Sequence, residues 1–381
     1  MDRDIFLKPP REANSSGKLW KLNRCVYGLD DASRCWYFRV KEELVAYGCK
    51  CSKYDSALFT FHDETGLAGV VVGHVDDFLW SGTNKFYKSV IVKLKSTFKI
   101  SKEDSDAFKY LGIELQHTEN GIYVSLHHYS QELKEIDLSP ERRKARNSTL
   151  TENETTQLRS AVGKLNWLAG QSRPDLSFDV CDISTKMKTP TVDLILQINK
   201  LILKAKYNNV FLYYPILDLN DLKIRCFTDA SYGNLSNGGS QGGFYTELVD
   251  KYNSSPIEWQ SKRLRRTPHS TLAAETIAMV EGMEAAYSCS MLLSEILYDN
   301  RKEIPVEMII DNYSLFQSVH STTSVTDRRL RIEMAILREA HSRSDFKLKW
   351  AKAEYQLSDC LTKRGSDPRK LIAHITGKEV V

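Results

Sequence analysis

At 381 residues the chain is long for one domain, so we expect roughly two or three domains that each bury a core. The formal net charge of +4, with 27% charged residues, is too close to balance to indicate a partner. The eight cysteines are scattered and do not form two sets of closely spaced pairs, which disfavours a zinc site or a disulfide framework. Without a signal-peptide pattern or a long apolar run, we expect a soluble intracellular protein, cytoplasmic or nuclear, that is not secreted and has no membrane partner.

The first third of the chain contains a predicted tight hairpin. A helix is expected from about residue 32 to residue 47, and an apolar strand pattern covers 69–75. Asp76 and Asp77 follow this strand and precede the apolar residues 78–80. Paired aspartates in a turn are commonly only turn chemistry, whereas apolar flanks on both sides would hold the carboxylates rigidly, as a metal site requires.

A second hairpin and two helices are expected further along. Strand patterns at 108–115 and 121–126 are joined through Asn120-Gly121, a strong hairpin signal. Helical periodicity covers 157–169 and about 193–206.

Four acidic residues in the last third belong to four different predicted elements. Asp229 ends the apolar strand 223–231, and Asp311 directly follows the strand 306–310. Glu275 lies on the helix face that should be buried, where an unpaired charge is costly. Asp359 opens the helix-like segment 357–363. Four such carboxylates can share a small volume only with cations between them, which indicates phosphodiester hydrolysis by two divalent ions, Mg²⁺ or Mn²⁺.

Strands and basic residues complete this region. The glycine-rich turn 237–243 leads into a second strand, 257–260 is a third, and 346–350 is the last. Four basic side chains follow the third strand and are either simple surface or phosphate contacts: Lys262, Arg263, Arg265 and Arg266.

The order of the four acids along the chain resembles that in the ribonuclease H family, and the short sequence motifs around them resemble those of its copia-type retrotransposon branch. These motifs are Thr228–Ser231, Ala273–Glu275, Asp311-Asn312 and Ser358–Lys363. In the first third, His74-Val75-Asp76-Asp77 resembles the tyrosine-x-Asp-Asp signature of reverse transcriptases, and Val26-Tyr27-Gly28-Leu29 resembles a segment that precedes it in copia-type polymerases.

This resemblance implies an α/β and α+β multidomain protein. Residues 1–150 would be a partial reverse-transcriptase palm and thumb, 151–215 a connection, and 216–381 a ribonuclease H-like fold with a mixed central sheet flanked by helices. The implied activity is cleavage of RNA in RNA–DNA hybrids, and a template–primer duplex is the further partner implied for the polymerase part. The implied catalytic and metal-ligating residues, for two Mg²⁺ or Mn²⁺ ions, are Asp229, Glu275, Asp311 and Asp359.

The sequence departs from the family pattern in three places. His74 replaces the tyrosine of the signature. The third polymerase aspartate of the family lies upstream of the segment that matches residues 4–10, and Asp2 or Asp4 at a free terminus cannot preorganise a metal ligand, so little nucleotide addition by this chain alone is expected. The last loop, 351–356, lacks the histidine of many ribonucleases H, which leaves Glu354 as a candidate helper.

Two alternatives stay open at this point. The chain could be a non-catalytic nucleic-acid-binding remnant of a retroelement, or a polymerase completed by a separate chain or an upstream segment.

Overall fold

The structure, a computed structural model, describes residues 4–13, 17–23, 25–26, 28–323, 325 and 327–378. Asp2 and Tyr27, named above, lie outside the described residues. The chain packs as two compact units: an N-terminal unit (Met1–Glu103 with Leu292–Lys302) and a C-terminal unit (Asp104–Met291 with Glu303–Val381). Across the described part of the chain, no helix combines the length and the apolar character needed to cross a bilayer.

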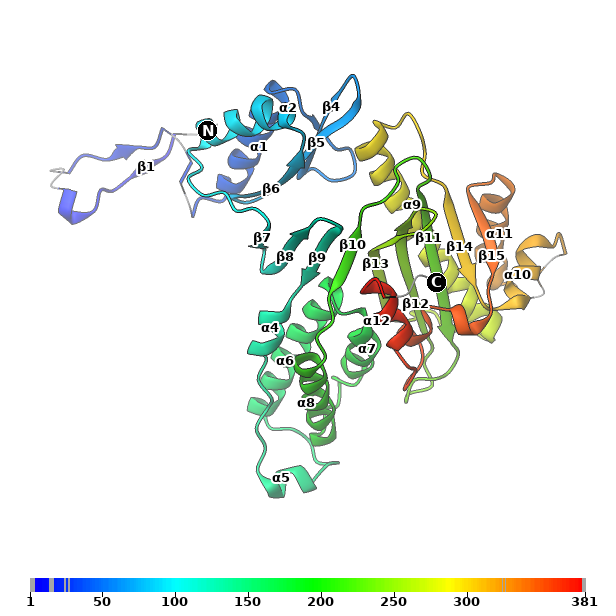
Figure 1. Cartoon of the computed structure of the whole chain (residues 1–381). Coiled ribbons are helices and arrows are strands. Elements are labelled where there is room, and N and C mark those ends of the chain that lie inside the picture. The colour runs from blue at the N-terminus through cyan, green and yellow to red at the C-terminus, as the bar shows by residue number, and fades with distance from the viewer. Residues whose placement is uncertain are drawn as a thin grey trace. The chain divides into compact units, whose positions relative to one another are not determined.

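The N-terminal unit is built on a four-stranded antiparallel sheet of order β3-β4-β5-β6 (Figure 1). Its helix α1 (Ala32–Ala46) confirms the helix predicted from residue 32, and it buries Val40 and Leu44 against Phe59 and Val71 of the sheet. The other elements are β1 (Phe6–Leu7), η1 (Arg11–Ala13), β2 (Trp20–Lys21), β3 (Lys50–Cys51), β4 (Leu58–Asp63), β5 (Gly66–His74), β6 (Asp77–Gly82), α2 (Asn84–Phe86), η2 (Tyr87–Ile91) and α3 (Val92–Phe98).

The predicted hairpin at the paired aspartates is confirmed. His74 of β5 pairs with Asp77 of β6, so the bend consists of Val75 and Asp76 alone. Val75 adopts a positive φ of 54°, as tight two-residue hairpin loops require.

The C-terminal unit begins with a small antiparallel sheet and a group of helices. The sheet has the order β10-β9-β8-β7, and α6 begins with a capping box made by Thr151 and Glu154. Leu158 and Leu165 of α6 pack with Ile195 and Ile198 of α8 in one apolar core. The elements are β7 (Ala107–Tyr110), β8 (Ile113–Thr118), β9 (Gly121–Ser125), α4 (His127–Glu132), α5 (Pro140–Lys144), α6 (Glu152–Gln171), η3 (Pro174–Leu176), α7 (Ser177–Thr185), α8 (Val192–Tyr207) and β10 (Leu212–Pro215).

One strand prediction here is wrong. The chain does not run straight through 108–115 but reverses between β7 and β8 at Leu111 and Gly112, whose φ angles are 51° and 82°. Two successive positive φ angles are those of a two-residue hairpin turn, which glycine makes accessible. The hairpin predicted around Asn120 is confirmed, since Thr118 pairs with Gly121.

A five-stranded mixed sheet forms the rest of the C-terminal unit, in the order β13-β12-β11-β14-β15 (Figure 1). Strand β12 is antiparallel to both of its neighbours, β13 and β11, whereas β11, β14 and β15 are mutually parallel. The elements are β11 (Lys223–Ser231), β12 (Gln241–Val249), β13 (Ser254–Arg263), α9 (Thr271–Tyr298), β14 (Val306–Ile310), α10 (Tyr313–His320), α11 (Leu330–Ser342), β15 (Phe346–Trp350), η4 (Ala353–Tyr355), η5 (Asp359–Leu361) and α12 (Arg369–Ile375).

Successive side chains of β11 point to opposite faces of this sheet, and each face is covered. Thr228 lies beneath Gly282 of α9, whereas the neighbouring Phe227 packs in a core with Leu361 of η5 and Leu371 of α12. The multidomain α/β and α+β fold class, with a mixed central sheet flanked by helices, is therefore confirmed.

The predicted domain limits at 150 and 215 stay predictions, and packing groups the chain differently. Residues 104–150 belong to the C-terminal unit because Val124 of β9 pairs with Leu212 of β10, and Leu126 and Leu133 enter the core of α6 and α8.

Candidate metal centre

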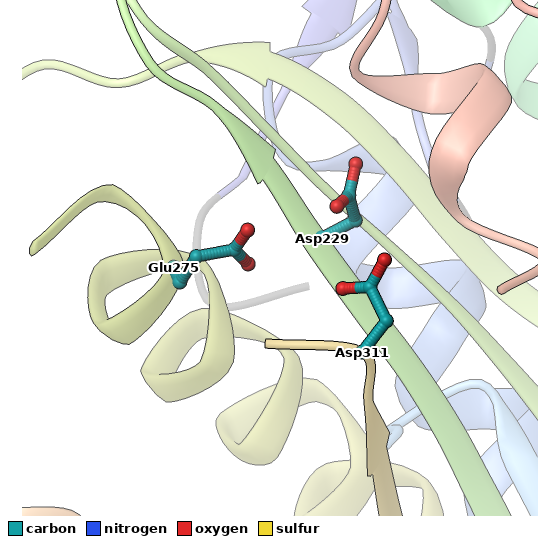
Figure 2. Close-up of side chains that lie close together, drawn as sticks. All are labelled: Asp229, Glu275 and Asp311. Carbon is teal, nitrogen blue, oxygen red and sulfur yellow. The ribbon is translucent and has the colours of Figure 1, made fainter. Parts of the chain in front are cut away.

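Strand register brings two of the predicted acids to the same level. Phe227 of β11 pairs with Ile309 of the parallel strand β14, so Asp229 and Asp311, each two residues further on, leave the same edge of the sheet. Residues two apart in a strand point to one face, so the carboxylates of neighbouring strands approach each other. Figure 2 shows both side chains at this edge.

The third acid, Glu275, comes from the second turn of α9. This helix lies very close to the sheet, because a Cβ at Gly282 would be 2.4 Å from the Thr228 Cγ2 atom. The Glu275 carboxylate points toward the strand ends (Figure 2) and accepts a hydrogen bond from the backbone N–H of Ala230. Ligand oxygens of Asp229, Glu275 and Asp311 all lie within 4.8 Å of one another.

Burial makes these three carboxylates hard to ionise together. Asp229 is 1% exposed and Glu275 is 5% exposed. Burial, together with the smaller effects of the Asp311 and Asp359 charges, raises the pKa of Asp229 to about 6, against the opposing effects of Lys363 and a Thr362 hydrogen bond. The pKa of Glu275 is raised well above its usual value by burial and then by Asp229 and Asp311, and burial also raises the pKa of Asp311.

The donor set fits a divalent ion with hard oxygen ligands. Every ligand atom is a carboxylate oxygen, the type that Mg²⁺ and Mn²⁺ prefer, and a cation among them would offset the repulsion that raises their pKa values. The three side chains that could hold the ion together are thus Asp229, Glu275 and Asp311.

The fourth predicted acid, Asp359, lies beside this group but is not one of the three. Its carboxylate accepts hydrogen bonds from the side chains of Lys363 and Ser366. The Lys363 ammonium also lies 3.5 Å from the Asp229 Oδ1 atom, so one lysine contacts both acids. The charge of Asp359 contributes to the raised pKa values of Asp229 and Asp311, which shows that it acts on the same site.

The segment that carries Asp359 is held tightly against the sheet. Leu361 is buried in the core, and Thr362 donates a hydrogen bond to the Asp229 carboxylate. Strand β12 offers Gly243 at this point, where a Cβ would be 2.9 Å from the Leu361 Cβ atom. A larger residue at 243 would push the Asp359 segment away from Asp229.

Sequence reasoning assigned no role to two side chains of the site. Lys363 follows Asp359 by four residues, a spacing that is usually a solvated helical ion pair. Gln356 is buried, donates a hydrogen bond from Nε2 to the Thr228 carbonyl oxygen at 3.0 Å and also hydrogen-bonds Asp311. Glu354, the predicted helper, is exposed, and its carboxylate lies 4.0 Å from the Lys352 ammonium.

The four predicted nucleic-acid-binding side chains have different surroundings. Lys262 lies 3.0 Å from the Glu281 carboxylate, and Arg266 forms an ion pair with Glu333. By contrast, Arg263 and Arg265 line an open hollow of about 510 Å³, together with the loop 237–240. This loop enters β12 at the same end of the sheet as the acids, since Asp229 pairs with Gly243.

The predicted polymerase residues Asp76 and Asp77 are both exposed; Asp76 lies in the bend of the β5–β6 hairpin, and Asp77 is the first residue of β6. The indole N–H of Trp36 donates a hydrogen bond to the carbonyl oxygen of Val75, which ties this bend to α1. Within the described ranges, neither aspartate belongs to a group of three or more side chains that could hold a metal ion.

Parts of this chain are similar in sequence to known proteins. Residues 1–145 match the family described as "Reverse transcriptase (RNA-dependent DNA polymerase)". The retrovirus-related Pol polyprotein from transposon RE2 of Arabidopsis thaliana is 26% identical over 71% of this chain, which covers 19% of that protein. The putative transposon Ty5-1 protein of Saccharomyces cerevisiae is 26% identical over 70% of this chain and is covered over 89% of its length.

Among solved structures, LC11-RNase H1 in complex with an RNA/DNA hybrid aligns with 37% of this chain and 94% of its own, at 17% identity and a TM-score of 0.28. The chain spans about a fifth of the length of the first two curated relatives.

The strand order, the covering helices and the acidic cluster define a ribonuclease H-like fold, which follows the region that matches the reverse transcriptase family. The chain is similar to the Pol region of Ty1/copia-type retrotransposons.

Proposed function

We propose that the C-terminal unit cleaves the RNA strand of RNA–DNA hybrids in a reaction that depends on divalent metal ions. The observation that carries this proposal is the convergence of the carboxylates of Asp229, Glu275 and Asp311 within 4.8 Å on a ribonuclease H-like sheet. A structural role explains this cluster poorly, since three buried acids that repel one another lower stability unless a cation lies between them.

The chain's own residues would hold and orient the reacting groups. Asp229, Glu275 and Asp311 would bind one ion, and Asp229 with Asp359 would bind a second. Bound divalent ions would activate a water and stabilise the leaving oxygen of the phosphodiester. The Ala230 N–H, the Thr362 hydroxyl and the Gln356 amide each hydrogen-bond one of these carboxylates and so keep it in place before substrate arrives.

The hollow lined by Arg263 and Arg265 supports contact with a nucleic-acid backbone near the acids. Guanidinium groups bind phosphate in a bidentate geometry, which positions a duplex without reading its base sequence. Hybrid selectivity would then rest on the 2′-hydroxyl and on helix shape.

The test is cleavage of an end-labelled RNA–DNA hybrid by the purified chain with Mg²⁺ or Mn²⁺. Asp229→Asn should abolish cleavage, whereas Asp137→Asn, a substitution at a fully exposed side chain, should leave it unchanged. A hybrid that stays intact with either metal would refute the proposal, as would cleavage that survives Asp229→Asn. Hybrid binding without cleavage would instead support the non-catalytic alternative.

For the N-terminal unit we propose weak or absent nucleotide addition by this chain alone, with a template–primer duplex as the partner still to be tested. The supporting observation is that, in the part of the chain that the structure describes, Asp76 and Asp77 are joined by no third metal-ligating side chain. Primer extension that is lost on Asp76→Asn would contradict this proposal.

A further inference from the structure

One cation of the chain itself lies inside the acidic site. The Lys363 ammonium contacts the Asp359 Oδ1 atom and lies 3.5 Å from the Asp229 Oδ1 atom. It thus lies between the two carboxylates that the proposed function assigns to a second divalent ion.

The charge of Lys363 acts on every acid of the cluster. It opposes the upward pKa shifts of Asp229, Glu275 and Asp311, and the carboxylates of Asp229, Asp359 and Asp311 in turn favour the charged form of the lysine. Opposite charges about 4 Å apart attract each other several-fold more strongly near a protein surface than in water. Lys363 therefore stabilises the metal-free site.

The side chain is placed so that it can leave. Its backbone is held, because Thr362 is tied to Asp229 and Arg364 forms two contacts, of 2.9 and 3.0 Å, with the Asp182 carboxylate of α7. The Lys363 side chain itself is 40% exposed, and its flexible four-carbon stem allows the ammonium to swing into solvent while the main chain stays in place.

We propose that Lys363 is an internal competitor for the second divalent ion, occupying the space between Asp229 and Asp359 until that ion displaces it. The inference rests on the proposed function and adds a positioning residue to it. Among the described residues, Lys363 forms no ion pair with Glu275 or Asp311, so the first ion, held by these two carboxylates and Asp229, would meet the ammonium only at Asp229.

Two consequences follow for metal binding. The first ion binds more tightly than the second, since the second must displace the ammonium from both of its carboxylates, Asp229 and Asp359. Removal of the Lys363 charge should strengthen binding of the second ion. It should also lower the stability of the fold in the absence of metal, because Asp229 and Asp359 then lose their ion pairs with Lys363.

The experiment is a Mn²⁺ titration of the full chain without nucleic acid, in which electron paramagnetic resonance measures free Mn²⁺. Lys363→Met should bind the second ion on the order of tenfold more tightly than the wild type, equivalent to about 1.4 kcal/mol. Lys363→Arg, which keeps the charge, should retain a weak second site. Lys251→Met removes the same charge at the opposite end of the sheet, beyond the Lys223–Val249 pair, and should leave both steps unchanged.

Thermal unfolding in EDTA and in Mn²⁺ gives a second readout. Lys363→Met should unfold at a lower temperature than the wild type in EDTA and gain more on addition of Mn²⁺. If Lys363→Met does not fold, Lys363→Gln, which keeps hydrogen-bonding capacity without the charge, is measured in its place.

The outcomes separate this inference from the proposed function. A wild-type chain that binds two Mn²⁺ ions, with a second affinity that Lys363→Met and Lys363→Gln leave unchanged or weaken, would overturn the competitor role alone. A wild-type chain that binds no Mn²⁺ would overturn both proposals.

Discussion

Replacement of Asp229 by asparagine should stabilise the metal-free protein while it removes the proposed activity. Asp229 is 1% exposed, and its pKa of about 6 compares with an ordinary value of 3.8. At about 1.36 kcal/mol for each factor of ten, this difference corresponds to roughly 3 kcal/mol of destabilisation when the carboxylate is ionised. Asparagine carries no charge and avoids this cost, in which the favourable contact of the carboxylate with Lys363 is already included.

The pH dependence of this effect has a defined sign. Because the pKa is higher in the folded state, the folded protein binds more protons than the unfolded chain between pH 3.8 and about 6. The wild type therefore loses stability as the pH rises through this window and bears the full cost above it. The advantage of Asp229→Asn should be largest at pH 8 and should disappear near pH 4.

The assay is differential scanning calorimetry in EDTA at pH 4, 6 and 8, followed by the same scans with Mn²⁺. The transition to be compared is the one that Mn²⁺ shifts in the wild type, since a chain with two compact units need not unfold in one step. Mn²⁺ should stabilise the wild type and have little effect on Asp229→Asn, and the exposed-site control Asp137→Asn should behave as the wild type. An Asp229→Asn protein that is less stable than the wild type at pH 8 in EDTA would refute the reasoning.

Three further predictions concern the supports of the site. Gly282→Ala should destabilise the C-terminal unit by about 1–3 kcal/mol and reduce hybrid cleavage, because the new Cβ forces α9 away from β11; urea unfolding measures the first effect. The double substitution Arg263→Met, Arg265→Met should weaken hybrid binding and lower the slope of log affinity against log salt by about two, as fluorescence anisotropy at several salt concentrations would measure. Asp182→Asn should loosen the Asp359 segment and lower the free energy of unfolding in urea by about 1 kcal/mol or less, since its partner Arg364 is half exposed.

Each of these predictions has a matched control and an opposing result. Gly170→Ala places a methyl group on α6 with no atom within 4 Å, so equal losses at 170 and 282 would show that close packing is not the cause. Lys262→Met removes a charge that already pairs with Glu281 and should change the salt slope less than either arginine does. Asp193→Asn removes one partner of another ion pair of the helical part, and an equal loss of unfolding free energy at both aspartates would argue against a specific role for Asp182.

Local patterns predicted most of the elements that carry the site. The strand 306–310 and the helix that starts at residue 32 were evident from apolar periodicity, because that signal depends only on which faces of an element are buried. The turn at Leu111-Gly112 was missed, since a single glycine in a strand pattern is a weak signal for a reversal. The resemblance of short sequence motifs to those of the ribonuclease H family, and not periodicity, identified Asp229, Glu275, Asp311 and Asp359 as one set.

The sequence alone determined the kind of element on which each acid lies and the family that the short motifs around the acids resemble. Only the tertiary structure decided that Asp229 and Asp311 stand level on parallel strands, that Glu275 reaches them where Gly282 lets a helix approach, and that Lys363 lies between Asp229 and Asp359. The physical reason is that register, helix-to-sheet distance and the pairing of a lysine with a distant carboxylate are set by contacts between residues far apart in the chain, which no local periodicity records.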